Sequence, residues 1–379
     1  MMWIILSVFD ILFAYIAEIH FNKNRLISII ALLCIIILNT IILGFRDFGV
    51  GTDTLAYVED YFNTANKIHN LAFLSELNNY DKGYLLLALF STLFSSSPQS
   101  LLFFTELFII SFYVLGLYET RKVLKCNLPC IFLLFVLLYQ FETINLMRQF
   151  CAMSLLVYGF SQFLQKHYKR YLFLQILGYF FHSSSILFII IPILQYLSNS
   201  KSKLKYRFPL ILFVIISLMF VFYYTFIQYF SSLHIISGDY AYRYGESTLF
   251  AAESSNSKGF IKDIVMTGSL LVIIYLSNKK VHIPKDIIYM GLLLIVFNFM
   301  FSSMRTIMIY FFRLGYYWGL IMIIYLSVIF QMYKRKDFFF MCSLYLYLTV
   351  AVMAAYRAYG YSPEGWVNNV YRSKILSIE

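Results

Sequence analysis

Apolar runs of about 17 to 23 residues recur along the chain and are separated by short polar segments. A helix of that length crosses the ~30 Å hydrocarbon core of a bilayer. The clearest runs cover residues 3–19, 26–43, 101–119, 128–146, 148–165, 208–230, 261–277, 287–303 and 313–332. The pattern predicts an all-α, polytopic integral membrane protein with about 10–12 transmembrane helices.

Lysines and arginines gather in the short segments between these runs. The six clusters are Lys23/Arg25, Arg121/Lys122/Lys125, Lys166/Lys169/Arg170, Lys201/Lys203/Lys205/Arg207, Lys279/Lys280/Lys285 and Lys334/Arg335/Lys336. Short loops rich in basic residues stay on the cytoplasmic side of a membrane. We therefore expect all six clusters on the cytoplasmic face, with the polar loops 44–82 and 231–260 on the outer face.

Two apolar segments do not fit a full crossing. The run at 84–95 is too short to span, so we expect a re-entrant or interfacial helix there. Residues 171–197 separate two basic clusters, and we expect two half-length helices that meet at residues 182–185. Irregular backbone at that depth must be buried in protein or line a wet cavity. A single long span is the alternative, but it would place every later loop on the wrong side. Residues 1–379 are predicted to form one membrane domain.

Composition supports this class and excludes others. The 379-residue chain is 61% hydrophobic and 13% charged, and its mean hydropathy is +0.73. A soluble domain carries about 25% charged residues. The net charge of +11 is spread over the loops, which indicates membrane topology and no nucleic-acid partner. The first run lacks a basic leader, so we expect a retained helix rather than a signal peptide. The five cysteines show neither metal spacing nor a disulfide framework, and we predict no metal and no cofactor.

The outer loop begins with the polar stretch FRDFGVGTDTLAYVEDYF, residues 45–62. Its glycines permit a tight turn, and Thr-Asp-Thr before an amphipathic segment is typical of a helix start. One interpretation is a structural loop on the membrane surface. The other makes Asp53 a base or a sugar-hydroxyl ligand, with Arg46 close by. The sequence GVGT is not a phosphate loop, because no Gly-Lys-Ser/Thr follows it.

Ionisable residues near apolar runs are costly there and often functional. Arg148 is either an arginine that reaches the interface or an anion ligand beside Asn145 and Gln149. His182 is either structural, or it is a general base near neutral pH or a phosphate contact. Arg305 and Arg313 lie eight residues apart, about two helical turns, and are either interfacial anchors or a clamp for a diphosphate.

The motifs FR-x-x-x-VGTDT-x-x-Y, NLMRQ, FHSSSIL and FFR together resemble the EpsG family, which belongs with the Wzy-type polysaccharide polymerases. The likeness covers about residues 40 to 330. It implies polymerisation of undecaprenyl-diphosphate-linked oligosaccharide repeat units at the outer face of the bacterial plasma (inner) membrane. The family motifs correspond to Arg46, Gly51, Asp53, Tyr57, Arg148, His182 and Arg313. The implied partners are the lipid-linked oligosaccharide, the bilayer, and a flippase and chain-length regulator of the same pathway.

Such a transfer expels a dianionic leaving group, which needs positive charge or a metal to stabilise it, and it activates a hydroxyl, which needs a base. We expect Arg148 and Arg313, with Arg305, to bind the diphosphate. Arg46, Gly51 and Tyr57 are the other expected substrate ligands. Asp53 or His182 is the expected base, and the sequence does not separate the two. The alternatives are a glycosyltransferase that adds a branch sugar from a polyprenyl-phosphate sugar, and a flippase or other transporter.

Overall fold

The computed structural model describes residues 2–51, 53–68, 80–199, 207–211, 214, 215, 218, 257–280, 283–303, 312–333, 337–360 and 372–376. The chain divides into two compact units. The first comprises Met1–Ile189 and Leu320–Glu379, and the second comprises Ile190–Gly319. This division does not decide whether residues 1–379 form one membrane domain, which stays a prediction.

The all-α membrane class is confirmed. Within the described ranges, seven helices are long and apolar enough to cross a membrane. They are α1 (Met2–His20), α2 (Arg25–Gly44), α5 (Gln99–Leu124), α15 (Ser257–Lys280), α16 (Lys285–Ser303), α17 (Phe312–Met332) and α18 (Phe338–Gly360). Two predicted features, the span at 208–230 and the loop at 231–260, lie mostly outside the described residues.

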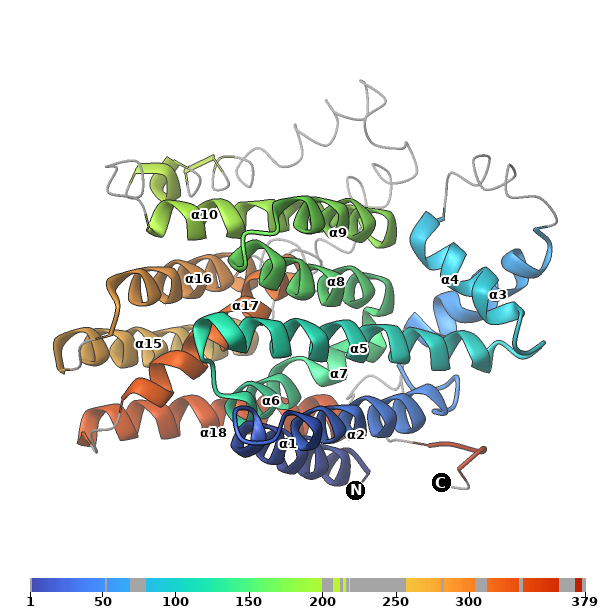
Figure 1. Ribbon diagram of the computed structural model, residues 1–379, viewed down its shortest axis with the longest axis horizontal. Coiled ribbons are helices and arrows are strands. Elements are labelled where there is room, and N and C mark those ends of the chain that lie inside the picture. The colour runs from blue at the N-terminus through green and yellow to red at the C-terminus, as the bar shows by residue number, and fades with distance from the viewer. Residues whose placement is uncertain are drawn as a thin grey trace. The chain divides into compact units, whose positions relative to one another are not determined.

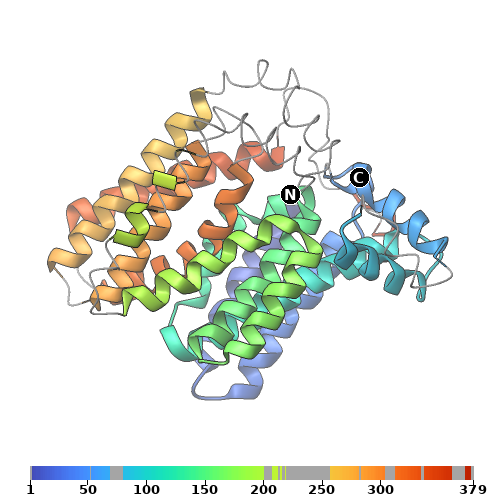
Figure 2. The ribbon, with the colours of Figure 1, turned by 90° about the horizontal axis from the view of Figure 1, so that it is seen from above.

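The first unit is built around α8 (Met147–Leu164), of whose 18 residues 14 are buried. Helix α5 packs on one side of α8, and the 14-residue α9 (Tyr168–Phe181) packs on the other (Figure 1). Helices α1 and α2 pack on each other (Figure 2), with α2 against α5 and α1 against α6 (Leu128–Leu138). Their outer surface is apolar, with Ile4 69% and Leu26 67% exposed, as expected for a lipid-facing surface.

A polar cluster is buried between α1, α2 and the short helix α7 (Gln140–Asn145). Asp10 Oδ1 accepts a 2.7 Å hydrogen bond from Asn39 Nδ2. Gln140 Nε2 lies 3.0 Å from Asn39 Oδ1 and 3.4 Å from Asp10 Oδ2. The acid that interrupts the first apolar run is therefore held by two amides, as a polar group away from water requires.

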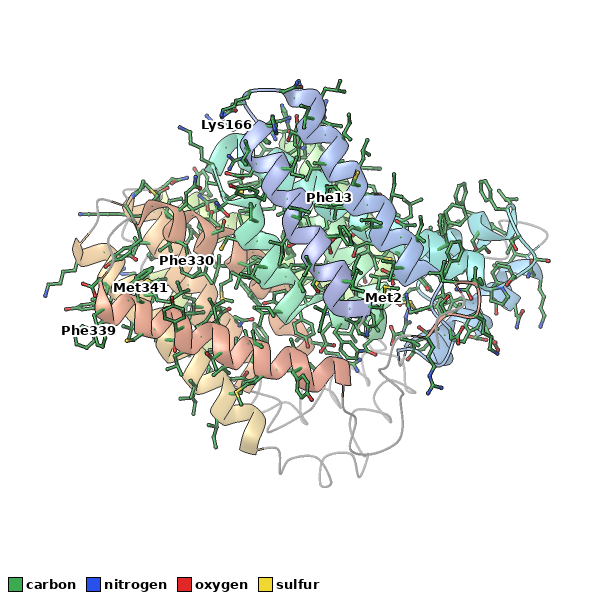
Figure 3. All side chains as sticks on the ribbon, turned by 90° about the horizontal axis from the view of Figure 1, so that it is seen from below. Met2, Phe13, Lys166, Phe330, Phe339 and Met341 are labelled. Carbon is green, nitrogen blue, oxygen red and sulfur yellow. The ribbon has the colours of Figure 1, made fainter. Side chains whose placement is uncertain are left out.

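One end of the first unit carries the basic clusters, and we call it the basic end. Arg121 forms a 2.7 Å ion pair with Glu18, and Arg25 Nε donates to Tyr118 Oη at 2.8 Å. These contacts join the α1–α2 turn to the end of α5. Gln165 at the end of α8 also reaches α5, where it donates to Glu119. Figure 3 shows Lys166 toward this end and Met2 at the opposite end. Three of the predicted clusters thus share one end of the bundle.

Residues 128–146, predicted as one span, form two helices. Helix α6 (Leu128–Leu138) stops at Tyr139, where φ is −132° and ψ is −26°, and α7 follows. The break directs the Gln140 side chain to the Asp10–Asn39 pair, a tertiary contact that hydropathy does not encode.

The two short elements have the lengths that were predicted, and their placement in the membrane stays a prediction. Helix α4 (Lys82–Thr92) has 11 residues. The chain reverses after α9: a 3₁₀ helix, η3 (Ser183–Ile189), follows His182, and Gln175 Nε2 donates to Ser185 O at 2.9 Å. Phe188 returns to Phe160 of α8, with ring centroids 6.5 Å apart. The turn therefore lies at His182.

The second unit contains α10 (Ile190–Ser198), α15, α16 and the start of α17. Helix α15 packs on α16, and α10 also contacts α16. Trp318 of α17 stacks on Phe297 of α16, with ring centroids 4.9 Å apart. Arg313 lies near the start of α17.

Candidate functional site

Arg46 lies at the end of the first unit opposite the basic clusters, which we call the loop end. Its side chain is fully buried and pairs with Glu106 of α5 at 2.7 Å. The other guanidinium contacts are Leu43 O at 2.6 Å, Val50 O at 3.3 Å, Thr54 Oγ1 at 3.2 Å and Met147 Sδ at 3.1 Å. Arg46 thus joins the outer loop to α5 and α8. This burial does not support the prediction that Arg46 binds substrate, and it makes Arg46 a positioning residue.

Gly51 shapes the loop through its backbone. Its φ is +94°, and a Cβ there would lie 2.7 Å from the carbonyl oxygen of Ile144. Only glycine fits this conformation and this approach. The backbone conformation alone therefore explains why glycine occupies position 51, and the expected role of Gly51 in substrate binding is not needed for that explanation.

Asp53 follows at the start of η1 (Thr54–Val58), a π-helical turn that continues into α3 (Glu59–Asn66). The predicted helix start is present, although the Asp53 side chain makes no capping hydrogen bond. Single π-helical turns often occur at functional sites. Asp53 is 9% exposed and acts electrostatically on Arg148.

Arg148 starts α8 and is held by the outer loop. Its Nη1 lies 2.8 Å from Asp81 Oδ2 and 3.1 Å from Tyr61 Oη. The guanidinium carbon lies 3.9 Å from the ring centroid of Tyr57, a cation–π contact. The side chains of Arg148 and Asp81 are 19% and 26% exposed. Unlike Arg46, Arg148 is therefore partly exposed, and its guanidinium is held by residues of the loop 44–82.

Four tyrosines surround this ion pair. The ring of Tyr61 lies edge-to-face with those of Tyr57, Tyr80 and Tyr84, at centroid distances of 6.5, 4.9 and 5.0 Å. The Tyr61 hydroxyl also accepts the backbone N–H of Asp81 at 3.0 Å. Tyr61 and Tyr84 are buried, whereas Tyr57 is half-buried. The cluster fixes Arg148 and Asp81 in one geometry.

Burial shifts the pKa values of two loop groups at this site, Asp81 and Tyr61. It raises the pKa of the Asp81 carboxyl above 3.8, while the neighbouring Arg148 acts in the opposite direction. Burial also raises the pKa of the Tyr61 hydroxyl above its ordinary value, so Tyr61 stays neutral near pH 7. The raised pKa of Asp81 moves this carboxyl toward the range that is useful in acid–base catalysis.

His182 lies at the loop end as well. It follows the last residue of α9, and its Nδ1 lies 2.7 Å from Ser184 Oγ. Helix α9 meets α4 there, since a Cβ on Gly83 would lie 2.9 Å from the backbone nitrogen of Phe181. Asp81 precedes Gly83 by two residues. The structure therefore gathers Asp53, Tyr57, Arg148 and His182 at one end of the first unit.

Two further arginines were predicted as substrate ligands. Arg305 lies outside the described residues. Arg313 belongs to the second unit, where its side chain is half-buried. A diphosphate clamp made with these two residues stays a prediction. Among the described residues, no three His, Cys, Asp or Glu side chains form a group that could hold a metal ion.

A C-terminal segment, residues 372–376, also contacts the loop end. Asp47 N donates to Arg372 O at 2.9 Å, and Asp47 Oδ1 accepts from Lys374 N at 2.9 Å. Ser373 is buried and donates to Phe45 O. The loop between α2 and η1 is therefore fixed by the C-terminal segment as well as by Arg46.

Three contributors were not among the predicted site residues: Asp81, Tyr61 and Glu106. Glu106 had a signal, because it is an acid within the apolar run 101–119 and needs a buried partner. Asp81 lies among six acids of the loop 44–82, and nothing in the sequence distinguishes it from the others.

The model of the EpsG family matches residues 29–367 of this chain. No curated protein and no solved structure matches. The matched range contains Arg46, Asp53, Tyr57, Tyr61, Asp81, Arg148 and His182, whereas the C-terminal segment 372–376 lies outside it.

Proposed function

Because the chain belongs to the EpsG family, whose members are polysaccharide polymerase-like proteins, we propose that it polymerises undecaprenyl-diphosphate-linked oligosaccharide repeat units. The growing chain leaves its lipid diphosphate and is transferred to the terminal sugar of the next lipid-linked unit. The product is a surface polysaccharide. The reaction takes place at the outer face of the bacterial plasma membrane.

The observation that carries the proposal is the partly exposed Arg148 among tyrosines at the end opposite the basic clusters. The positive-inside rule assigns the basic end to the cytoplasm, so the loop end faces outward, where lipid-linked repeat units await joining. A guanidinium grips a diphosphate bidentately and stabilises the charge that develops on it. Arg313 and Arg305 are the further candidates for this clamp.

The aromatic surroundings suit a sugar substrate. The half-buried ring of Tyr57, which carries Arg148 and lies edge-to-face with Tyr61, provides aromatic surface next to the guanidinium on which a pyranose can pack. The acceptor hydroxyl needs a base, for which Asp53 and His182 are the candidates named by the sequence. The chemistry requires no cofactor. A flippase that supplies the lipid-linked units and a regulator of chain length are the proposed partners.

Deletion of the gene, followed by electrophoresis of the surface glycans, tests the proposal. We expect a single repeat unit in place of the polymer ladder. A full ladder with altered sugars would instead indicate a branch glycosyltransferase, and loss of surface repeats with intermediates trapped inside the cell would indicate a transporter. Either result would overturn the proposal.

Complementation with variants then tests the site. Arg148→Ala should lower polymer formation by about 10²-fold or more, by analogy with the loss of one oxyanion donor. Arg148→Lys keeps the charge but loses the planar fork, and it should restore only part of the activity. Arg170→Ala is the matched control, because Arg170 is an exposed arginine at the basic end. A well-expressed Arg148→Ala protein with a normal ladder would remove Arg148 from the mechanism.

A further inference from the structure

The ion pair between Arg148 and Asp81 occupies the group that the proposed function needs for the diphosphate. Arg148 Nη1 is shared between the Asp81 carboxylate at 2.8 Å and the Tyr61 hydroxyl at 3.1 Å. Among the described residues, the buried Nε of Arg148 has no hydrogen-bond acceptor. A guanidinium can donate five hydrogen bonds. The site as it stands therefore leaves part of the Arg148 hydrogen-bonding capacity unused.

A diphosphate is a stronger ligand for this guanidinium than a single carboxylate oxygen. It carries at least two negative charges and can accept two parallel hydrogen bonds from the planar fork. The side chains of Arg148 and Asp81 are 19% and 26% exposed, so a ligand can reach this pair and water screens it more than the closed Arg46–Glu106 pair. A bound diphosphate should therefore displace Asp81 from Arg148.

We propose that Asp81 and the diphosphate of the lipid-linked donor compete for Arg148, and that the released Asp81 carboxylate is the base for the acceptor hydroxyl. This inference rests on the proposed function and assigns a residue to its proton transfer. Substrate binding thus activates the base, because the diphosphate of the donor takes over Arg148, whose positive charge otherwise lowers the basicity of Asp81. Without substrate, the Asp81 carboxylate is bonded to Arg148 and does not act as a base.

The step balances as a substitution at the anomeric carbon. Asp81 takes the proton of the acceptor hydroxyl as the oxygen forms a bond to the anomeric carbon of the donor sugar. The bond from that carbon to the diphosphate oxygen breaks, and its electron pair leaves with undecaprenyl diphosphate. Arg148 stabilises the charge on this leaving group. Asp81 later returns the proton to water, and Arg148 recovers its carboxylate partner when the lipid leaves.

Asp81 suits this role better than its neighbours because it contacts Arg148 directly while its side chain stays 26% exposed. Partial burial raises the pKa of its carboxyl, and neutralisation of Arg148 by a diphosphate would raise it further. Asp53 is only 9% exposed, so it offers an acceptor hydroxyl less access than Asp81 does. Tyr61 has a pKa raised by burial and stays protonated, so it remains a donor or acceptor of hydrogen bonds.

A different role for Asp81 would be to hold Arg148 in place for the substrate. The two roles predict opposite effects of Asp81→Asn on binding. Asparagine has nearly the same shape, it is favoured at the first position of a helix, and it keeps the backbone N–H that Tyr61 accepts. The variant therefore removes the negative charge without removing the local structure.

The experiment measures binding of undecaprenyl diphosphate to the purified full-length protein in lipid nanodiscs, together with polymer formation in cells. We expect Asp81→Asn to bind undecaprenyl diphosphate about two- to tenfold more tightly, because the competitor for Arg148 has lost its charge. Polymer formation should fall by about 10²-fold or more, because the base is gone. Asp60→Asn is the matched control: Asp60 is a loop carboxylate bonded to Tyr80, and this variant should change neither quantity.

Three results would overturn the inference. Weaker binding by Asp81→Asn, while the wild type binds normally, would make Asp81 a positioning residue for Arg148. A normal polymer ladder from Asp81→Asn would exclude it as the base. Both results leave the proposed function intact. Failure of the wild-type protein to bind undecaprenyl diphosphate would instead overturn the proposed donor, and the inference with it.

Discussion

The buried pair of Arg46 and Glu106 provides the sharpest test of what the outer loop needs in order to fold. In Arg46→Met the Glu106 carboxylate, whose side chain is 2% exposed, would lose its 2.7 Å partner. Removing one member of a buried ion pair costs about 3–5 kcal/mol, because the other charge is left without compensation. The carbonyls of Leu43 and Val50 would lose their donor as well.

The expected result is a less stable protein with a misplaced loop. A loss of about 3–5 kcal/mol corresponds to a fall of about 6–10 °C in the apparent unfolding temperature, at roughly 2 °C per kcal/mol. The assay is thermal unfolding of the detergent-solubilised protein, followed by size-exclusion chromatography, together with the surface polymer ladder. Arg170→Met is the control, because that arginine is exposed and should lower neither readout.

A double variant separates a structural role for Arg46 from a role in substrate binding. Arg46→Met combined with Glu106→Met removes both charges, and such replacements of buried pairs are often neutral for stability. If Arg46 only positions the loop, the double variant should regain most of the stability and polymer formation. A double variant that is stable but makes no polymer would refute our reasoning and restore the prediction that Arg46 contacts substrate.

Three further perturbations follow from the loop-end geometry. Gly51→Ala should cost about 1–3 kcal/mol in the same unfolding assay because of its φ of +94°, whereas Gly49→Ala, with nothing within 4 Å of its Cβ, should not. The native Asp81 carboxyl holds its proton more tightly than the unfolded chain does, so its contribution to stability is present below pH 3.8 and is lost as pH rises through the raised pKa. Asp81→Asn should lack this loss, and the unfolding temperatures of the two proteins at several pH values measure it. Removal of residues 372–379 should reduce polymer formation, because the loop loses its hydrogen bonds at Phe45 and Asp47, and the ladder measures this.

Each of these has a contrary outcome that is easy to observe. Equal unfolding temperatures for Gly51→Ala and Gly49→Ala would mean that the loop relaxes without strain. A pH-independent difference between wild type and Asp81→Asn would mean that Asp81 titrates alike in the folded and unfolded chains. A truncated protein with a full ladder would show that Arg46 alone fixes the loop.

The helices could be predicted from the sequence because a helix that faces lipid needs an apolar run of about 20 residues, and such runs are visible along the chain. The run at 26–43 became Arg25–Gly44, and the run at 148–165 became Met147–Leu164. The rule failed at Tyr139, where the chain remains apolar but the helix breaks. Hydropathy reports which environment a residue prefers, whereas the break serves a contact between Gln140 and a polar pair about a hundred residues earlier in the chain.

The site could be predicted only in part, for a related reason. Motif positions such as Asp53 and His182 do meet at the loop end, but Asp81 was missed. Its partner Arg148 is 67 residues away in the chain, and Glu106 is 60 residues from Arg46. A sequence shows that a charge near a membrane needs a partner, but the partner is chosen by the packing of helices.

The ion pairs of Arg46 and Arg148 show how strongly helix packing determines what a charged residue near a membrane can do. Arg46 and Arg148 each lie at a helix end beside the same loop, and each forms an ion pair with a carboxylate at 2.7 or 2.8 Å. The Arg46 pair is closed to water and takes up five acceptors, so it has nothing left to offer a ligand. The Arg148 pair is partly exposed, weaker in consequence, and rests on an aromatic ring. A substrate can displace a partner only from the second pair. The first pair fixes the loop next to α2, and the proposed exchange at Arg148 requires only that the Asp81 carboxylate leave the guanidinium.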